Sequence, residues 1–344
     1  MLPAGQRVVA MAAGVSSTCA LSQLGVLFCW GENRFGELGD GTRTPRPLPT
    51  PVQTSLRFVS VTGTHGTSRT CATTAAGGAY CWGYNLNGEL GDGSRQDRYL
   101  PAPVGGGVPF RTLSSSYHTC GVGYDDRAYC WGLALGGALG NGGATGDTAQ
   151  PVPVAGDPRF RSVTNGMEFS CGLTAAGIGY CWGWGAMLGN GSGEARLSPY
   201  PVSGGLTFVE LSAGEEHTCG LTAAGALYCW GKANGRYDPA VLEPLRVTGV
   251  PSFAQIAAGD YDTCALTGDG IAYCWSTGQA PRRVPSNIRF AGLTGGQHYA
   301  CGYTPGGAAY CWSTQFSFGY LGDGTGQSDT VPVRVAPFPA PAGR

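Results

Sequence analysis

The cysteines of this chain constrain its fold more than any other feature. All fourteen fall into pairs whose two members are ten positions apart. The pairs are Cys19 and Cys29, Cys71 and Cys81, Cys120 and Cys130, Cys171 and Cys181, Cys219 and Cys229, Cys264 and Cys274, and Cys301 and Cys311. Each pair brackets a segment such as TCALSQLGVLFCWG, in which two short apolar runs flank a glycine-containing turn, as in a β-hairpin. One spacing repeated along the chain predicts tandem copies of a single structural unit.

The geometry of such a hairpin allows each cysteine pair to form a disulfide. If Ser22 and Val26 close the first hairpin loop, Cys19 lies directly opposite Cys29. Opposed residues of an antiparallel pair have Cβ atoms about 4.5 to 5.5 Å apart, and their Cα atoms fall within disulfide range. The sequence therefore predicts one disulfide inside every hairpin. It also predicts an oxidising compartment, which means an extracellular or periplasmic protein.

Metal binding is the competing interpretation of the cysteines. Zinc sites use CxxC-type clusters or mixtures of cysteine and histidine, whereas each unit here offers two isolated thiols. We therefore expect no metal site and no cofactor.

Each cysteine pair belongs to a longer unit with four predicted strands. Upstream of a pair lie an apolar residue, a second one three positions on, and usually a glycine or serine six positions on, as in Phe208, Leu211 and Gly214. Downstream lie Trp-Gly in the first five units, a glycine-rich loop that usually ends in LGDG or LGNG, and a proline-containing strand such as Pro201-Val202. Four short strands per unit are typical of a propeller blade, whose outer edge tolerates proline. The 60 glycines and 12% charged residues agree with a turn-rich, all-β protein.

At this level of detail the units resemble a known repeat. AGEEHTCGLTAAGALYCWG and WGENRFGELGDGTRT are similar to repeats of the regulator of chromosome condensation family. The resemblance runs from residue 7 to about residue 336 and implies a seven-bladed β-propeller, a single domain over residues 1–344 with short flexible ends. Family members serve unrelated partners, so the resemblance implies a binding module without naming what it binds. The cysteine pairs and the missing basic tail set this chain apart from nuclear members, and we expect a disulfide-rich, secreted, bacterial-type member.

The sequence carries no recognisable catalytic motif. GxSxG, HExxH, a Walker loop and a dinucleotide fingerprint in a strand-to-helix context are all missing, so we expect a non-enzymatic protein. The LGDG and LGNG loops hold an acid or amide that could suggest calcium, but Asp-Gly and Asn-Gly are what tight turns with positive φ require. These residues are Asp40, Asp92, Asn141, Asn190 and Asp323. The tryptophan after each second cysteine is expected to pack in the core: Trp30, Trp82, Trp131, Trp182, Trp230, Trp275 and Trp312.

Charge and hydropathy narrow the range of partners. A formal net charge of −1 gives no basic field, which argues against nucleic acid. No apolar run approaches the roughly 20 residues that cross a bilayer, so we expect no membrane span. The first residues do not form a convincing signal peptide, and we expect the chain to begin after one has been removed.

Recognition is predicted in the turn that precedes the first cysteine of each unit, because this turn varies on a constant scaffold. These turns should all lie on one face, around the central channel. The candidate partner-binding residues are Tyr117, Glu168, Phe169, Glu215, Glu216, Asp260, Tyr261, Asp262, His298 and Tyr299. Phe169 and Tyr261 would be exposed anchors, and the acids would attract a protein with a basic surface. An inhibitor or a surface adhesion module fits this description.

A second class of function remains open from the sequence. The acids Glu215, Glu216, Asp260 and Asp262 could instead serve a small-ligand binder or an enzyme at an acidic mouth of the channel. The sixth unit is also degenerate, because Trp275 is followed by Ser276 and by no LGDG loop. The ring should therefore be asymmetric, with an open flank near the acidic sector. The sequence does not identify the partner or the oligomeric state.

Overall fold

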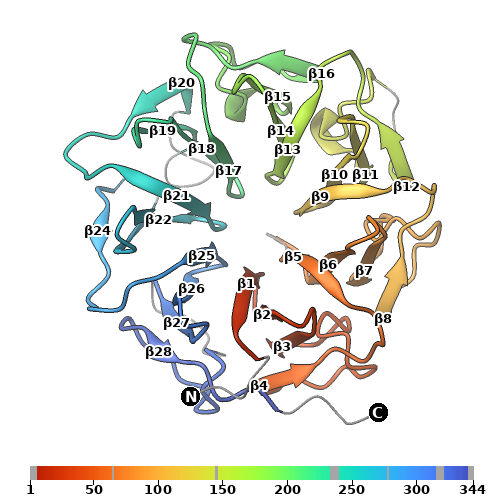
Figure 1. Cartoon of the computed structure of the whole chain (residues 1–344). Helices are drawn as coiled ribbons and strands as arrows, with labels where there is room; N and C mark the ends of the chain where they lie inside the picture. The colour runs from red at the N-terminus through yellow and green to blue at the C-terminus, as the bar shows by residue number, and fades with distance from the viewer. Residues whose placement is uncertain are drawn as a thin grey trace.

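The computed structural model describes residues 6–63, 66–143, 146–232, 240–276, 279–314 and 321–339. Seven four-stranded antiparallel sheets are arranged around a central axis, with the innermost strand of each sheet beside the centre and the fourth strand at the rim (Figure 1). The predicted all-β, seven-bladed propeller is confirmed.

Each blade is one continuous piece of chain whose strands pair in sequence order. Blade 1 holds β1 (Val8–Ala13), β2 (Ser17–Ser22), β3 (Leu27–Gly31) and β4 (Arg46–Pro51). Blade 2 holds β5 (Phe58–Thr62), β6 (Arg69–Thr74), β7 (Ala79–Gly83) and β8 (Arg98–Pro103). Blade 3 holds β9 (Phe110–Ser115), β10 (His118–Gly123), β11 (Ala128–Gly132) and β12 (Thr148–Pro153), with the short helix η1 (Leu135–Gly137) before β12. Blade 4 holds β13 (Phe160–Asn165), β14 (Phe169–Thr174), β15 (Gly179–Gly183) and β16 (Arg196–Pro201), with η2 (Gly185–Met187) before β16.

The last three blades contain the shortest strands. Blade 5 holds β17 (Glu210–Ala213), β18 (His217–Leu221), β19 (Leu227–Gly231) and β20 (Val241–Arg246). Blade 6 holds β21 (Phe253–Ala258), β22 (Asp262–Thr267), β23 (Ala272–Ser276) and β24 (Arg282–Arg283). Blade 7 holds β25 (Gly292–Gly295), β26 (Tyr299–Tyr303), β27 (Ala309–Ser313) and β28 (Val333–Arg334).

The cysteine hairpins form as predicted. The amide of Ser22 donates to the carbonyl of Val26 at 2.9 Å, and this closure sets Cys19 opposite Cys29. The Cα atoms of this first pair are 4.1 Å apart. Such short spacing is typical of the non-hydrogen-bonded positions of an antiparallel ladder, where side chains lie closest.

All fourteen cysteines form disulfides within their own hairpins, so each disulfide joins the second and third strands of a blade. The bonds link Cys19 to Cys29, Cys71 to Cys81, Cys120 to Cys130, Cys171 to Cys181, Cys219 to Cys229, Cys264 to Cys274, and Cys301 to Cys311. The second cysteines of blades 2, 4 and 7 are 0% exposed: Cys81, Cys181 and Cys311. These three residues belong to the hydrophobic core and present no sulfur atom to a partner, so their role is structural.

The hydrophobic core lies between blades, so that neighbouring blades share it. One cluster joins Cys19 and Leu27 of blade 1 to Phe58 and Trp82 of blade 2. The rings of Phe58 and Trp82 lie 6.1 Å apart at their centroids. All seven tryptophans predicted for the core are buried: Trp30, Trp82, Trp131, Trp182, Trp230, Trp275 and Trp312.

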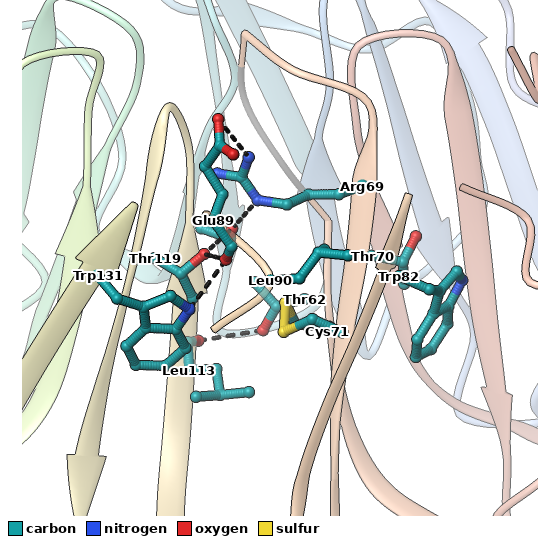
Figure 2. Close-up of a disulfide and its surroundings, with 12 residues drawn as sticks. Thr62, Arg69, Thr70, Cys71, Trp82, Glu89, Leu90, Leu113, Thr119 and Trp131 are labelled. Carbon is teal, nitrogen blue, oxygen red and sulfur yellow. Dashed lines mark hydrogen bonds and ion pairs between the residues drawn. A yellow bond between two sulfur atoms is a disulfide. The ribbon is translucent and has the colours of Figure 1, made fainter. Parts of the chain in front are cut away.

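The LGDG loops connect one blade to the next, as Figure 2 shows for blades 2 and 3. The carbonyl of Glu89 accepts hydrogen bonds from Trp131 Nε1 and Thr119 Oγ1, both at 2.9 Å. Gly91 has a φ of +72°, and a Cβ there would lie 2.5 Å from Trp131 Nε1, so this position requires glycine. Asp92 accepts from the amide of Ser94 at 2.8 Å, as a turn-capping residue does. The turn interpretation of these acids is therefore confirmed here.

A buried ion pair strengthens the same junction. Arg69 and Glu89 are both inaccessible to solvent, with Arg69 Nη1 3.9 Å from Glu89 Oε1 (Figure 2). Arg69 Nε also donates to Ser115 Oγ of blade 3 at 2.8 Å. Burial lowers the pKa of Arg69 to about 10, and the carboxylate of Glu89 opposes this shift. The guanidinium therefore stays charged at neutral pH and joins the two blades.

Blade 7 closes against blade 1 without exchanging a strand. The Tyr299 hydroxyl donates to the carbonyl of Ser17 at 2.8 Å, and the amide of Ala13 donates to Thr294 Oγ1 at 3.0 Å. The segment after β28 then reaches blade 1, where Phe338 is buried with its ring centroid 5.1 Å from that of Phe28. The ordered contacts therefore extend slightly past residue 336, the predicted end of the repeats.

Within the described ranges, no helix is long and apolar enough to cross a membrane. The same residues contain no group of three or more histidine, cysteine, aspartate or glutamate side chains placed to hold a metal ion.

Candidate functional site

The turns between the first and second strands of the blades surround one end of the central channel. The channel has a volume of about 370 Å³ and is lined by the innermost strands. Neighbouring turns approach each other closely: a Cβ on Gly259 of blade 6 would lie 2.3 Å from the carbonyl oxygen of Gly296 in blade 7. The amide of Glu215 donates to the carbonyl of Asp260 at 3.1 Å. We call this end of the ring the turn face.

Residues three positions before the first cysteine of a blade reach the surface of the turn face. Tyr261 is 37% exposed, and the others are partly exposed. The residues in this position that were predicted to bind a partner are Tyr117, Glu168, Glu216, Tyr261 and His298.

Residues two positions before the first cysteine are buried, which corrects part of the prediction. Phe169 is 0% exposed, and Asp262 and Tyr299 are also buried. Each begins the second strand of its blade, where the alternation of side chains turns it away from the face. The prediction of Phe169 as an exposed anchor is wrong, because its ring packs with Ala213 of the next blade.

The buried position joins blades throughout the ring, a role that the sequence analysis missed. His118 Nε2 and Ser170 Oγ are 2.6 Å apart, and His217 Nε2 and Thr263 Oγ1 are 2.8 Å apart. In both cases the partner belongs to the following blade. Burial lowers the pKa of His118 to about 3, with Arg69 adding to the shift, so this imidazole is neutral. The fixed spacing of two residues before the first cysteine could have revealed this role, because strand alternation predicts which side chain turns inward.

A compact group at the channel mouth combines two buried acids with three larger side chains. We define this mouth cluster as Tyr117, Glu215, Asp260, Tyr261 and His298. The Tyr117 hydroxyl donates to Glu215 Oε1 at 3.1 Å, and Tyr261 also hydrogen-bonds to Glu215. The rings of Tyr261 and His298 stack with their centroids 5.3 Å apart. Blades 3, 5, 6 and 7 thereby contribute to one site.

The acids of the mouth cluster repel one another and are poorly solvated. Burial raises the pKa of Glu215, and the neighbouring carboxylates of Asp260 and Glu216 raise it further. Hydrogen bonds from Tyr261 and Tyr117 act in the opposite direction. The pKa of Tyr117 is raised by burial and then by Glu215, so this phenol remains a neutral donor. Lys232 Nζ lies 3.5 Å from Glu216 Oε1 at the edge of the site. The predicted acids Glu168, Glu215, Glu216 and Asp260 thus stay together on this sector, whereas Asp262 turns inward.

Asp262 instead connects blade 6 to blade 7. Thr314 Oγ1 donates to Asp262 Oδ2 at 2.5 Å, and His298 Nδ1 lies 3.7 Å from the same oxygen. The Asp262 carboxylate lies beside the imidazole of His298, against which the ring of Tyr261 stacks. Asp262 therefore positions the mouth cluster without facing solvent.

One acid inside the channel was not predicted. Glu210 lies at the start of β17 and accepts a hydrogen bond from the amide of Ile256 through Oε2 at 3.1 Å. Burial raises its pKa to about 7, while that hydrogen bond and Arg161 act against the shift. Nearby channel hydroxyls bond between blades, as when Ser212 Oγ accepts from the amide of Ala258 at 2.9 Å. Glu210 is therefore a channel residue whose protonation changes near neutral pH.

Comparisons with known proteins agree with this architecture. Models described as "Regulator of chromosome condensation (RCC1) repeat" match residues 8–37, 25–68 and 208–237. The chain is 30% identical to the ultraviolet-B receptor UVR8 of Arabidopsis thaliana over 194 residues, which cover 55% of this chain and 44% of the receptor. It therefore spans less than half of the length of that relative.

Two solved structures share the fold at low identity. Human WBSCR16 superposes with a TM-score of 0.79 at 19% identity, covering 90% of this chain and 94% of that one. Prp20p of Saccharomyces cerevisiae, described with its binding properties to Gsp1p and histones, has a TM-score of 0.76 at 19% identity over 96% of this chain and 88% of its own. Both establish similarity of fold alone.

Proposed function

Starting from a seven-bladed propeller with repeats of the regulator of chromosome condensation type, we propose that the protein is a non-enzymatic binding module that captures a basic segment of a partner protein over the mouth cluster. An inhibitor or a surface adhesion module is the form of this role that we favour. The observation that carries the proposal is Glu215, a buried acid with a raised pKa beneath two tyrosines.

A cationic side chain from a partner would relieve the repulsion among these acids. Glu215 and Asp260 lie side by side in a poorly solvated place, so an arginine or lysine beside them would stabilise their ionised forms. Tyr261, the more exposed of the two rings, supplies flat apolar surface for the aliphatic part of such a side chain. Glu168 and Glu216 at the surface would attract a basic segment before contact.

Two further observations bear on the location of the protein and on the class of its partner. Seven intra-hairpin disulfides suit an oxidising compartment, so we propose an extracellular or periplasmic location. The formal net charge of −1 leaves nucleic acid without an electrostatic attraction, and we propose a protein as the partner.

The test is partner binding measured on variants of the turn face. A partner is captured with oxidised protein from the extracellular fraction of the source organism, purified, and studied by surface plasmon resonance. Tyr261→Ala should raise the dissociation rate about tenfold or more, because it removes a central aromatic anchor. Glu216→Gln should lower mainly the association rate and its dependence on salt. Affinity should rise with pH through the titration of Glu215, because a bound cation favours the carboxylate.

The hairpin turns between second and third strands provide the matched control, because they lie at the opposite end of the blades. Tyr124→Ala removes a well-exposed tyrosine of blade 3 from that end and should leave both rate constants unchanged. If Tyr124→Ala or a folded Asp92→Ala variant abolishes binding while Tyr261→Ala and Glu216→Gln do not, the turn face is the wrong surface.

Glu210 favours a second candidate function, binding of a small cationic ligand or catalysis inside the channel. A carboxyl group with a pKa of about 7 in a cavity of about 370 Å³ has the properties of a general acid or base. In this case Glu210→Gln, and not Glu216→Gln, would remove ligand binding or turnover in a screen of amines and other cationic small molecules.

A further inference from the structure

A loop from the preceding blade fills the space between adjacent blades at the first four junctions of the ring. In blade 1, the long connection between β3 and β4 places Glu37, Leu38 and Gly39 against blade 2. Leu38 is fully buried, and the carbonyl of Glu37 accepts from Trp82 Nε1 at 2.9 Å. The same carbonyl position accepts from the next tryptophan at the following three junctions: Glu89 with Trp131, Ala138 with Trp182 and Met187 with Trp230. A glycine-rich loop from one blade is thus the normal partner of the tryptophan in the next.

The junction between blades 6 and 7 has no such loop in its sequence. β23 ends at Ser276 and β24 begins at Arg282, and the residues between them contain no Leu-Gly-Asp. A cavity of about 340 Å³ lies at this junction, lined by Trp275, Gln279, Arg282, Arg283, Trp312 and Ser313 among others. We call it the blade 6–7 gap.

Two buried polar groups in the wall of this gap have no hydrogen-bond partner in the described part of the chain. Trp312 is 2% exposed and Ser313 is 3% exposed. Among the residues that the structure describes, neither Trp312 Nε1 nor Ser313 Oγ has a partner. An unsatisfied buried donor costs about 1 to 3 kcal/mol, so both groups favour an incoming acceptor. Trp30 Nε1 also has no partner among the described residues. Blade 7, which precedes blade 1 in the ring, does contain LGDG at 321–324, and residues 315–320 lie outside the described ranges.

The rim of the gap is cationic. Arg282 and Arg283 form the two-residue outer strand β24, and both are exposed. Arg283 Nη2 donates to the carbonyl of Ser286 at 3.3 Å, which leaves further donors of this guanidinium facing solvent. At the junctions that follow blades 1 and 2, the aspartate of the loop pairs with an arginine of its own outer strand, Asp40 with Arg46 at 2.8 Å and Asp92 with Arg98 at 2.7 Å. The gap therefore offers cations without the acidic loop that accompanies them after blades 1 and 2.

We propose that the blade 6–7 gap is a second binding site, which accepts an acidic, glycine-containing turn from a partner polypeptide. The turn would supply a backbone carbonyl to Trp312 Nε1, an apolar side chain to the cavity and a carboxylate to Arg282 or Arg283. It would thereby replace the missing loop with contacts like those that Glu89 and Leu90 make with blade 3 and that Asp92 makes with Arg98 of its own blade. The site is independent of the mouth cluster and does not rest on the function proposed above.

The probe for this site comes from the protein itself. A cyclic peptide with the sequence of residues 83–95, GYNLNGELGDGSR, is titrated into the full-length, oxidised, ¹⁵N-labelled protein. The indole N–H resonance of Trp312, assigned as the one lost in Trp312→Phe, should shift on binding. Arg282→Glu combined with Arg283→Glu should weaken binding about tenfold or more, because two favourable charges become unfavourable. A peptide in which the glutamate and aspartate are lysine should not bind.

Matched variants separate this site from others. Arg57→Glu reverses an exposed charge between blades 1 and 2, and it should leave peptide affinity unchanged, as should Tyr261→Ala in the mouth cluster. Replacing residues 277–281 by residues 84–97 grafts a loop into the gap and should abolish peptide binding. The proposal is overturned if the Trp312 resonance does not respond to millimolar peptide, or if the lysine peptide binds equally well. Binding that survives the two arginine reversals would also overturn it, and these tests stand even where the grafted chain does not fold.

Discussion

Tyr117 and Glu215 lie 98 positions apart in sequence, yet the hydroxyl of one donates to the carboxylate of the other at 3.1 Å. This bond joins blade 3 to blade 5 past the turn of blade 4. It lowers the pKa of Glu215, against the larger effect of burial. The channel mouth is thus held by a bond that no single repeat contains.

Tyr117→Phe should raise the pKa of Glu215 further, because it removes a hydrogen bond to the ionised form. The variant should also lose about 1 kcal/mol of unfolding free energy near neutral pH. The pKa is measured by NMR titration of the glutamate side-chain carboxyl carbons. Tyr129→Phe is the control, because its hydroxyl bonds to Asp125 at the opposite end of blade 3, at 2.8 Å, and should leave Glu215 unaffected. A Glu215 pKa that is equal in wild type and Tyr117→Phe would contradict the prediction.

Glu210→Gln should stabilise the protein in a pH-dependent way. The folded-state pKa of about 7 lies above the ordinary value of 4.5, so the folded state binds the proton more tightly than the unfolded state. This contribution to stability is fully present below about pH 4.5 and is lost as the pH rises through 7. Glutamine should therefore match wild type at about pH 4 and gain on the order of 3 kcal/mol at about pH 8. Urea unfolding across this range tests it, and a difference independent of pH would count against the raised pKa.

Trp82→Phe and Trp312→Phe form a matched pair of core substitutions. Both tryptophans are buried, but Trp82 Nε1 is bonded to the carbonyl of Glu37, whereas Trp312 Nε1 is unpartnered in the described structure. Each variant loses packing, and Trp82→Phe loses a hydrogen bond as well. Trp82→Phe should therefore destabilise the protein by about 1 to 2 kcal/mol more than Trp312→Phe in chemical denaturation. Equal losses would show that the orphaned donor of Trp312 is satisfied in solution.

Removal of one disulfide should weaken the ring without unfolding it. Cys120→Ala combined with Cys130→Ala opens a short loop in blade 3 and should cost about 3 kcal/mol or less, because short loops restrain the unfolded chain less than long ones. Thermal unfolding followed by circular dichroism measures the loss. Mass spectrometry of a non-reduced digest should recover linked peptides from single hairpins alone. Links between hairpins, or complete unfolding under mild reduction, would contradict the prediction.

The periodic features of the sequence were sufficient to predict the fold. Ten-residue cysteine spacing and the loop closed by Ser22 and Val26 predicted the hairpin register, and the structure pairs Cys19 with Cys29. The tryptophans were assigned to the core for the same reason, since each has a fixed place on a strand. The turn role of Asp92 also follows from local chemistry, because Asp-Gly turns depend on their own few residues.

The candidate site was predicted less completely. Phe169 and Tyr261 look equivalent as aromatic residues in variable turns. Phe169 lies two positions before the first cysteine of its blade and is buried, whereas Tyr261 lies three positions before and is exposed, because successive side chains point in opposite directions. Glu210 was missed because an acid at the start of a strand has no distinctive motif. Its raised pKa comes from burial in a channel built by all the blades.

By itself, the sequence determined the number of blades, the strand order within each blade and the pairing of every cysteine, because these depend on interactions within a single repeat. Only the tertiary structure decided that Tyr117 reaches Glu215 and that Trp312 has no partner among the described residues, because both depend on what a different blade places beside the residue. Contacts inside a repeat follow from the spacing of its own residues. Contacts between repeats depend on ring closure and on the length of loops from neighbouring blades.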